Sequence, residues 1–227
     1  SMLNLLKSME LHKVSNLVFS SSCTVYGQPS RLPVTEDTPF ALAESPYGHT
    51  KQIGEDILNH TTRTNGQLQA LSLRYFNPVG AHPSALIGEF PVGTPANLVP
   101  FITQTVAGLR SKLKVYGNDY NTPDGTAIRD YIHVVDLAKA HVRAIERMLN
   151  NEQKKSYEYF NIGTGKGSSV LEVIQAFERI NHTKVPYEVV DRRAGDIVKI
   201  YADTTRANHE LNWKAQLNLD DMMKSAW

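Results

Sequence analysis

Two short apolar runs on either side of one amphipathic segment constrain the fold of this chain more than any other feature of its sequence. Residues 16–20 (Asn-Leu-Val-Phe-Ser) and residues 71–76 (Leu-Ser-Leu-Arg-Tyr-Phe) have the length and apolar content of buried parallel strands. Between them, Ser45 is a good N-cap and Pro46 suits the first helical position, so a helix is predicted there. The order strand, helix, strand predicts a right-handed parallel crossover and therefore an α/β fold.

The rest of the chain continues this alternation of helices and strands. Helices are predicted at residues 3–11 and 98–109, and a third helix runs from Asp136, as its N-cap, to residue 149. A fourth helix is predicted to follow the capping box Ser169-x-x-Glu172. Extended segments are predicted at residues 114–116, 131–135, 157–162 and 187–190. The pattern is helical again from Asp203 onwards. Residues 80–97 are rich in proline and glycine, which predicts a loop and a transition between domains.

Composition narrows the possible partners. The 227 residues carry a net charge of +1, which gives no reason to expect nucleic acid or an anionic membrane surface as a partner. No apolar run approaches the roughly 20 residues that span a bilayer. Cys23 is the single cysteine, which is compatible with a reducing compartment, and we expect a cytoplasmic protein. The eight histidines are scattered without metal-ligand spacing, so no metal is expected.

A Tyr-x-x-x-Lys pair gives the chain its first candidate site. Tyr47 and Lys51 lie four residues apart on the predicted helix, so their side chains share one face. Such a pair in isolation is typical of a helix surface. Ser22, however, follows the first predicted strand, and ligands bind at the carboxyl ends of parallel strands.

The three side chains together suit the removal of a proton from an alcohol as hydride leaves its carbon. A phenol has a pKa near 10, so a base that works near pH 7 needs about 4 kcal/mol of stabilisation of its phenolate. A lysine ammonium beside Tyr47 would supply it by charge attraction, and Ser22 would hold the reacting hydroxyl.

Two further motifs have competing interpretations. Residues 163–167 (Gly-Thr-Gly-Lys-Gly) resemble part of a dinucleotide fingerprint, but Ser168 stands where the third glycine is needed, which favours a plain strand-to-helix turn. Arg129 and Arg193 lie in charged clusters. They could form solvated salt bridges or clamp a pyrophosphate, and their spacing alone favours the salt bridges.

Seven segments in order carry a resemblance to a known family. They are residues 20–27 (Ser-Ser-Ser-Cys-Thr-Val-Tyr-Gly), Ser45-Pro46-Tyr47-Gly48-x-x-Lys51, residues 74–82 (Arg-Tyr-Phe-Asn-Pro-Val-Gly-Ala-His), residues 116–120 (Tyr-Gly-Asn-Asp-Tyr), Asp124-Gly125-Thr126, residues 129–134 (Arg-Asp-Tyr-Ile-His-Val) and Arg192-Arg193-x-Gly195-Asp196. With them the chain resembles the UDP-galactose 4-epimerases, also called UDP-glucose 4-epimerases, of the extended short-chain dehydrogenase/reductase family. The resemblance covers the chain after Ser1-Met2.

This resemblance implies a fold and a reaction. The fold would be the C-terminal part of a doubly wound, Rossmann-like parallel sheet with a smaller α/β substrate-binding domain. Residues 3–79 would belong to the NAD-binding domain and residues 80–227 mainly to the sugar-nucleotide domain, with segments near 131–149 returning to the first. Hydride would pass from sugar C4 to NAD, the 4-keto sugar would turn over, and hydride would return to its other face, which interconverts UDP-galactose and UDP-glucose.

The resemblance also implies roles for individual residues. Tyr47 would be the base, Lys51 would lower its pKa and bind the nicotinamide ribose, and Ser22 and Thr24 would hold the hexose. The remaining assignments are Tyr75 and Phe76 beside the nicotinamide, Cys23 near the sugar, Asn77, Asn97 and Leu98 on the sugar nucleotide, Val115 and Tyr116 beside uracil, Arg129, Arg193 and Asp196 on pyrophosphate and ribose, and Ile200 as a gate for N-acetylated sugars.

Two departures from related enzymes matter. Sugar-nucleotide 4,6-dehydratases have Asp-Glu where this chain has Cys23-Thr24, so epimerisation is favoured over elimination of water. The glycine-rich turn that binds the NAD pyrophosphate in the family is absent from the sequence. We therefore expect an N-terminally truncated chain that is inactive alone; the alternative is a non-catalytic fragment that binds a sugar nucleotide or a partner. The family forms homodimers, partly through the helix of Tyr47, and we make no prediction of dimerisation for this chain.

Overall fold

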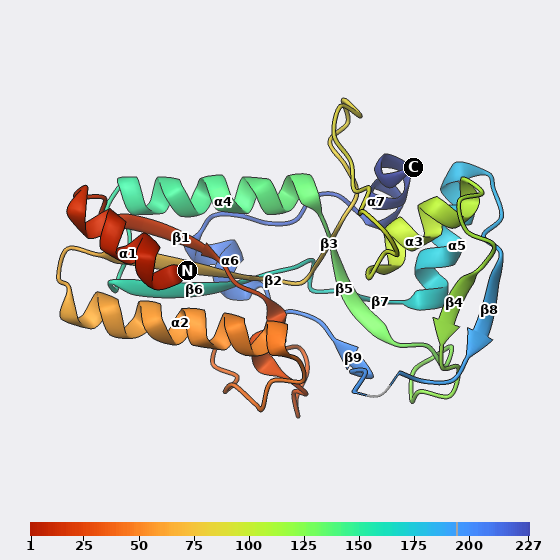
Figure 1. Ribbon diagram of the computed structural model, residues 1–227, viewed down its shortest axis with the longest axis horizontal. Helices are drawn as coiled ribbons and strands as arrows, with labels where there is room; N and C mark the ends of the chain where they lie inside the picture. The colour runs from red at the N-terminus through yellow and green to blue at the C-terminus, as the bar shows by residue number, and fades with distance from the viewer. Residues whose placement is uncertain (194) are drawn as a thin grey trace. The chain divides into compact units, whose positions relative to one another are not determined.

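The computed structural model describes residues 1–193 and 195–227 and contains both helices and parallel strands (Figure 1). The helices are α1 (Met2–Leu11), the 3-10 helix η1 (Cys23–Tyr26), α2 (Pro46–Thr64), α3 (Leu98–Val106), α4 (Val134–Leu149), α5 (Val170–Asn181), α6 (Thr205–Glu210) and α7 (Leu219–Ala226). The strands are β1 (Asn16–Ser20), β2 (Gln69–Tyr75), β3 (Asn77–Val79), β4 (Leu113–Tyr116), β5 (Ile128–His133), β6 (Tyr157–Ile162), β7 (Gly167–Ser169), β8 (Tyr187–Val190) and β9 (Lys199–Ile200).

The chain divides into two compact units. Unit 1 contains Ser1–Tyr75, Lys139–Ile162 and Asp203–Trp213, and unit 2 contains Phe76–Ala138, Gly163–Ala202 and Lys214–Trp227. The ligands of the two regions stay predictions: NAD for residues 3–79, and the sugar nucleotide mainly for residues 80–227.

A three-stranded parallel sheet in the order β1-β2-β6 forms the centre of unit 1. β1 pairs with β2 from Asn16 opposite Gln69 to Ser20 opposite Leu73, which confirms the predicted parallel crossover. In Figure 1 these strands run between α2 and α4. The side chains of Leu71 and Leu73 are fully buried, as a strand covered on both faces requires.

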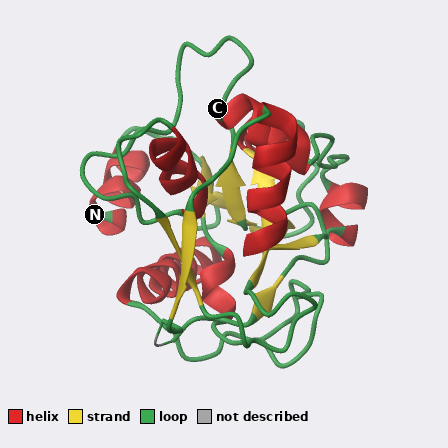
Figure 2. Ribbon diagram, turned by 90° about the vertical axis from the view of Figure 1, so that its right-hand side faces the viewer, coloured by secondary structure: helices red, strands yellow, loops and turns green. Residues whose placement is uncertain are grey.

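Unit 2 contains two smaller sheets. β5 pairs in parallel with β3 and β9 and antiparallel with β7, and β4 pairs in parallel with β8. Apolar side chains of α3, α5 and α7, including Ile102, Phe177 and Met222, form one core with Val79 and Val115. A long loop between β3 and α3 extends from this unit, yellow in Figure 1 and at the top of Figure 2.

Several predicted boundaries were wrong. Asp136 does not cap α4, because the helix begins two residues earlier, and Asp136 Oδ2 instead accepts hydrogen bonds from the backbone N–H groups of Gln216 and Leu217, both at 2.8 Å. The extended segment predicted at 131–135 is β5, which starts and ends earlier, and the helix predicted at 98–109 ends at Val106.

Other differences are additional elements. The helical pattern after Asp203 is two short helices, α6 and α7, separated by an extended stretch. The short strands β3, β7 and β9 were not predicted, because two or three residues are too few to show a periodicity. Within the described ranges, no helix is long and apolar enough to cross a bilayer.

Candidate functional site

The carboxyl end of β1 turns into a polar loop that starts the first half of the candidate site. Ser21 N–H donates to the Phe19 carbonyl at 2.9 Å, which ends the strand. Ser22 then has extended backbone, and its Oγ accepts from Thr24 N–H at 3.2 Å, so Ser22 is the N-cap of η1. Ser22 and Cys23 are both buried. The loop is therefore fixed by its own backbone contacts.

The start of α2 is packed against this loop. Ser45 Oγ accepts from Gly48 N–H at 3.1 Å and Pro46 occupies the first turn, which confirms the predicted helix start. A Cβ at Gly48 would lie 3.2 Å from the Thr24 carbonyl oxygen, so only glycine allows this approach without a shift. The helix consequently brings Tyr47 to the loop of Ser22 and Thr24.

Tyr47 and Lys51 share one face of α2, as predicted. Lys51 Nζ lies 5.3 Å from the centroid of the Tyr47 ring and 5.2 Å from that of Phe19. Lys51 Nζ also donates to the Ser20 carbonyl oxygen at 2.8 Å, and burial lowers the pKa of this amine. The ammonium is thus held between the end of β1 and the phenol ring, while Tyr47 itself is 52% exposed.

Tyr75, at the end of β2, adjoins the same group of residues. Burial raises the pKa of Tyr75, and the nearby Tyr47 and Cys23 raise it further. Its ring lies 6.4 Å from that of His141, tilted by 49°. Tyr75 is therefore a neutral phenol beside Tyr47 at neutral pH.

The Thr24 hydroxyl is an unsatisfied polar group in this region. Within residues 1–193 and 195–227, the buried Thr24 Oγ1 has no hydrogen-bond partner. A buried hydroxyl without a partner is costly, so such groups commonly serve a ligand. This observation fits the expectation that Thr24 contacts a bound sugar.

A buried charged network, which was not predicted from the sequence, contacts the loop of Ser21 and Ser22 (the serine loop). Arg74 Nη2 and Glu55 Oε2 are 2.7 Å apart, with only 4% and 2% of these side chains exposed. Ser21 Oγ donates to Glu55 Oε1 at 2.5 Å, and Arg74 Nη1 donates to Tyr26 Oη at 3.0 Å. An arginine in the middle of an apolar strand was the available signal, because a buried charge needs a partner.

The second group of candidate residues borders a cavity of about 150 Å³ in unit 2. Its lining includes the predicted residues Asn97, Leu98, Tyr116, Arg193 and Asp196. The predictions missed Phe101, Lys114 and Val170, which also line it. Their side chains reach the cavity only through the packing of α3, β4 and α5, so no local pattern identifies them.

Two charged residues that line this cavity have partners: Asp196 pairs with Arg129, which lies outside the lining, and Arg193 stacks on Tyr116. Arg129 Nη2 lies 2.5 Å from Asp196 Oδ1. Arg193 Cζ lies 4.0 Å from the centroid of the Tyr116 ring. The half-buried guanidinium of Arg129 and the guanidinium of Arg193, stacked on the Tyr116 ring, form a suitable site for a diphosphate next to a planar base.

Five predicted residues of unit 2, Arg129 among them, are not among those that line the cavity. Val115 and Ile200 are almost fully buried, and Val115 belongs to the hydrophobic core. Phe76 is likewise buried, and Asn77 is the first residue of β3. Their roles stay predictions.

The glycine-rich turn after β6 already holds a carboxylate. Asp130 Oδ1 accepts from the N–H and hydroxyl of Thr164 at 2.8 and 2.6 Å, and Asp130 Oδ2 accepts from Gly165 N–H at 3.0 Å. A Cβ at Gly163 would lie 2.5 Å from Asp130 Oδ2. The structure therefore confirms the plain turn, because its donors are occupied by a buried side chain of the protein.

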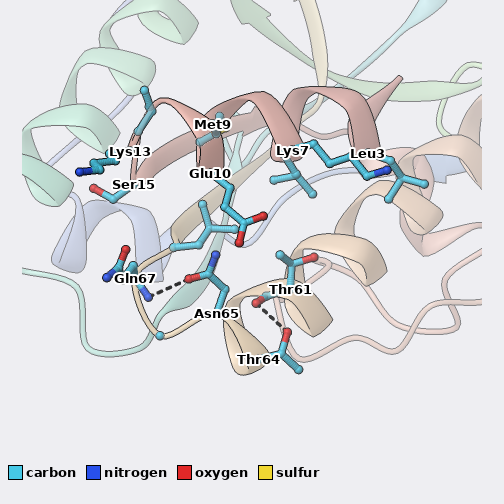
Figure 3. A pocket seen from close by; sticks show the side chains of 14 residues that line it. Leu3, Lys7, Met9, Glu10, Lys13, Ser15, Thr61, Thr64, Asn65 and Gln67 are labelled. Atoms are coloured by element: carbon cyan, nitrogen blue, oxygen red, sulfur yellow. Dashed lines mark hydrogen bonds between the residues drawn. The ribbon is translucent and has the colours of Figure 1, made fainter.

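A larger groove, of about 620 Å³, lies beside α1 in unit 1 (Figure 3). Its lining includes Lys7, Glu10, Thr61 and Asn65, and none of the candidate residues. Selection by volume alone would therefore have chosen a groove that contains none of the candidate residues.

Comparison with known proteins identifies the family. The family model described as GDP-mannose 4,6 dehydratase matches residues 1–226. The UDP-glucose 4-epimerase of Dictyostelium discoideum is 50% identical over 225 residues, which are 99% of this chain and 64% of the relative. The chain thus spans somewhat less than two thirds of the length of this curated relative.

Solved structures agree in fold. The UDP-glucose 4-epimerase of Bifidobacterium longum, in complex with NAD+ and UDP, has a TM-score of 0.93 and 49% identity, and the match covers 99% of this chain and 66% of that one. The enzyme of Brucella ovis, in complex with NAD, has a TM-score of 0.92 and 40% identity over 99% of this chain and 68% of that one. The fold is therefore the expected Rossmann-like α/β fold. By sequence and by fold, this chain belongs to the UDP-glucose 4-epimerases of the extended short-chain dehydrogenase/reductase family, within the group that the GDP-mannose 4,6-dehydratase model describes.

Proposed function

We propose that the chain carries the proton-transfer and sugar-nucleotide-binding residues of an NAD-dependent enzyme that interconverts UDP-galactose and UDP-glucose. One observation carries the proposal: Lys51 Nζ is anchored to the Ser20 carbonyl and lies 5.3 Å from the Tyr47 ring, at the end of β1. In a chain about half identical to a UDP-glucose 4-epimerase, this pair is the natural acid–base centre.

Tyr47 takes the proton of the sugar 4-hydroxyl and later returns it. The Lys51 ammonium favours the phenolate by charge attraction and binds the nicotinamide ribose. Ser22 and Thr24 hold the hexose by hydrogen bonds, with Cys23 beside them. When bound, NAD would supply the hydride acceptor for sugar C4, and Tyr75 and Phe76 would hold its nicotinamide end.

The cavity of unit 2 anchors the UDP part of the substrate. Arg129 and Arg193 bind the diphosphate, Asp196 binds the ribose, and Val115 and Tyr116 border the uracil. Asn77, Asn97 and Leu98 complete the contacts. This anchor keeps the 4-keto sugar in the site while it turns over and presents its other face.

The serine loop favours epimerisation over dehydration. Elimination of water across C5 and C6 needs an acid and a base near the sugar, and this chain has Cys23-Thr24 there. Neither a buried thiol nor a threonine hydroxyl serves as that pair at neutral pH. Ile200, buried in β9, is the proposed gate for N-acetylated sugars, and its moderate size suggests some tolerance of them.

Conversion of UDP-galactose to UDP-glucose by the chain with added NAD tests the activity. Wherever turnover is measurable, Tyr47→Phe should lower it by about 10²–10⁴-fold, as expected for loss of a general base, while UDP binding changes little. Thr50→Val, on the same helix turn, is the matched control and should leave turnover unchanged. Full turnover by Tyr47→Phe would contradict the assignment.

The alternative is a non-catalytic chain that binds a sugar nucleotide or a partner. It is favoured by one observation: the cavity of unit 2 is lined by Arg193 and Asp196, which suit a nucleoside diphosphate, and by none of the catalytic candidates. This alternative predicts UDP binding without turnover in the same assay. Ordinary epimerase rates from the 227-residue chain would rule it out. A homodimer formed partly through α2 is proposed for enzymes of this family, as the resemblance implies.

A further inference from the structure

Two consecutive arginines of unit 2 stack on two tyrosines: Tyr116, the last residue of β4, and Tyr120, in the loop that follows β4. Arg192 Cζ lies 4.2 Å from the centroid of the Tyr120 ring, and Arg193 Cζ lies 4.0 Å from that of Tyr116. Residues 192 and 193 are therefore each held against an aromatic ring.

The two arginines differ in what else they contact. Arg192 Nε donates to Asp119 Oδ1 at 2.7 Å and Arg192 Nη2 donates to the Asp119 carbonyl at 2.6 Å, so one edge of its guanidinium is occupied by Asp119. Arg193 lines the cavity, and among the described residues it has no ion-pair partner within 4.0 Å. Arg193 is thus available to an anion, whereas Arg192 is already paired with Asp119.

Tyr120 is a rigid support for Arg192. Its side chain is only 5% exposed, and its N–H donates to the Gly125 carbonyl at 3.0 Å. A Cβ at Gly117 would lie 2.6 Å from the Tyr120 ring and 2.9 Å from Arg192 Cγ. Glycine at position 117 therefore allows the backbone, the tyrosine ring and the arginine stem to pack closely.

We propose that Arg192 is a positioning residue: held by Asp119 and Tyr120, it fixes the backbone next to Arg193, so that the Arg193 guanidinium is already placed for the diphosphate of a nucleoside diphosphate. The proposal rests on the proposed function, because it takes UDP as the ligand of this cavity. Ordering these side chains before binding removes an entropic cost that the ligand would otherwise bear.

A competing account treats Arg192 only as one more positive charge near the diphosphate. The two accounts give opposite signs for Asp119. If charge alone matters, removing the Asp119 carboxylate should tighten UDP binding, since one negative charge disappears. If Arg192 acts by position, the same change should weaken binding, because the clamp is lost.

Calorimetric titration of the 227-residue chain with UDP distinguishes the accounts. Arg192→Ala, Arg192→Lys and Asp119→Ala should each weaken UDP binding by about three- to tenfold. Lysine at position 192 should not restore UDP affinity, because an ammonium lacks the planar arrangement of donors that hydrogen-bonds Asp119 twice. The matched control is Arg179→Ala, an exposed arginine paired with Asp220 in the same unit, which should stay within about twofold of the unaltered chain.

Each outcome has a definite meaning. Normal binding by Arg192→Lys together with tighter binding by Asp119→Ala would overturn the positioning role. UDP binding of normal affinity by Arg192→Ala would also overturn it, provided that Arg193→Ala binds UDP more weakly. Weaker binding by Arg193→Ala would show that the cavity is the UDP site. Failure of the unaltered chain to bind UDP, or normal binding by Arg193→Ala, would overturn the proposed nucleotide site and this inference with it.

Discussion

Gly125 shows how much one residue decides in the loop after β4. Its φ is +78°, a left-handed backbone that favours glycine, and a Cβ there would lie 2.0 Å from the Asn118 carbonyl oxygen. The obstacle is backbone, so no side-chain rotation relieves it. The loop that carries Asp119 and Tyr120 therefore depends on glycine at this position.

Gly125→Ala should destabilise the protein by about 1–3 kcal/mol beyond the cost of left-handed backbone alone, because of the Asn118 overlap. Gly93→Ala is the matched control, since Gly93 has φ +82° and nothing within 4 Å of its would-be Cβ. The free energy of unfolding in urea measures both. Equal losses in the two variants would mean that the loop yields and the overlap is unimportant.

The start of α5 shows how an element depends on a distant carboxylate. Ser169 and Glu172 form the predicted capping box, with Ser169 Oγ accepting from Glu172 N–H at 3.0 Å. The Ser169 hydroxyl in turn donates to Asp124 Oδ2, and Asp124 Oδ1 accepts from Thr126 N–H at 2.9 Å. Burial by itself would raise the pKa of Asp124, but the hydrogen bonds from Ser169 and Thr126 together outweigh it and lower that pKa.

Asp124→Asn should therefore cost about 1–2 kcal/mol of stability at pH 7, the usual worth of hydrogen bonds to a charged group. A carboxyl whose folded-state pKa is depressed contributes stability above its unfolded pKa, near 3.9, and loses it as the pH falls through the folded value. The difference between the two proteins should consequently shrink between pH 5 and about pH 2.

Urea unfolding across this pH range tests the linkage. Asp37→Asn, at an exposed aspartate with no side-chain hydrogen bond among the described contacts, is the control and should leave the curve unchanged. If the free energies of unfolding of Asp124→Asn and of the unaltered protein differed by the same amount at every pH, the ionised Asp124 carboxylate would not be the source of the stability.

At the scale of the whole of unit 1, the Arg74–Glu55 pair joins elements far apart in sequence. Glu55 lies on α2 and Arg74 on β2, and Tyr157 of β6 donates to Glu55 Oε2 at 3.0 Å. Through Ser21 the pair also reaches the loop of the candidate catalytic residues. The charge on each partner is compensated only while the other is present.

Arg74→Met should lower the free energy of unfolding by about 3–5 kcal/mol, because Glu55 would be left charged and buried. The double variant Arg74→Met/Glu55→Gln should recover part of this loss, since neither charge remains. Lys112→Met removes one partner of an exposed pair, with Lys112 Nζ 3.8 Å from Glu188, and should change stability by less than about 1 kcal/mol. Simple additivity of the two core substitutions would show that the charges are not coupled.

The residues of the candidate site were predicted with unequal success for a physical reason. Tyr47 and Lys51 were paired correctly because four residues along a helix determine a shared face. Lys114 and Phe101 were missed because they meet only where α3 and β4 pack. Asp136 was misread as a cap because its carboxylate binds the backbone of residues 216 and 217, which no local pattern reveals.

By itself the sequence determined what depends on short separations along the chain: the α/β alternation, the capped starts of α2 and α5, the Tyr47–Lys51 face and, through seven ordered segments, the family. Only the tertiary structure decided which charges are buried together. Asp130 fills the glycine turn 33 residues or more away, and Arg74 meets Glu55 across a helix and a strand. Desolvation forces every buried charge to find a partner, but the partner's identity depends on packing between distant segments.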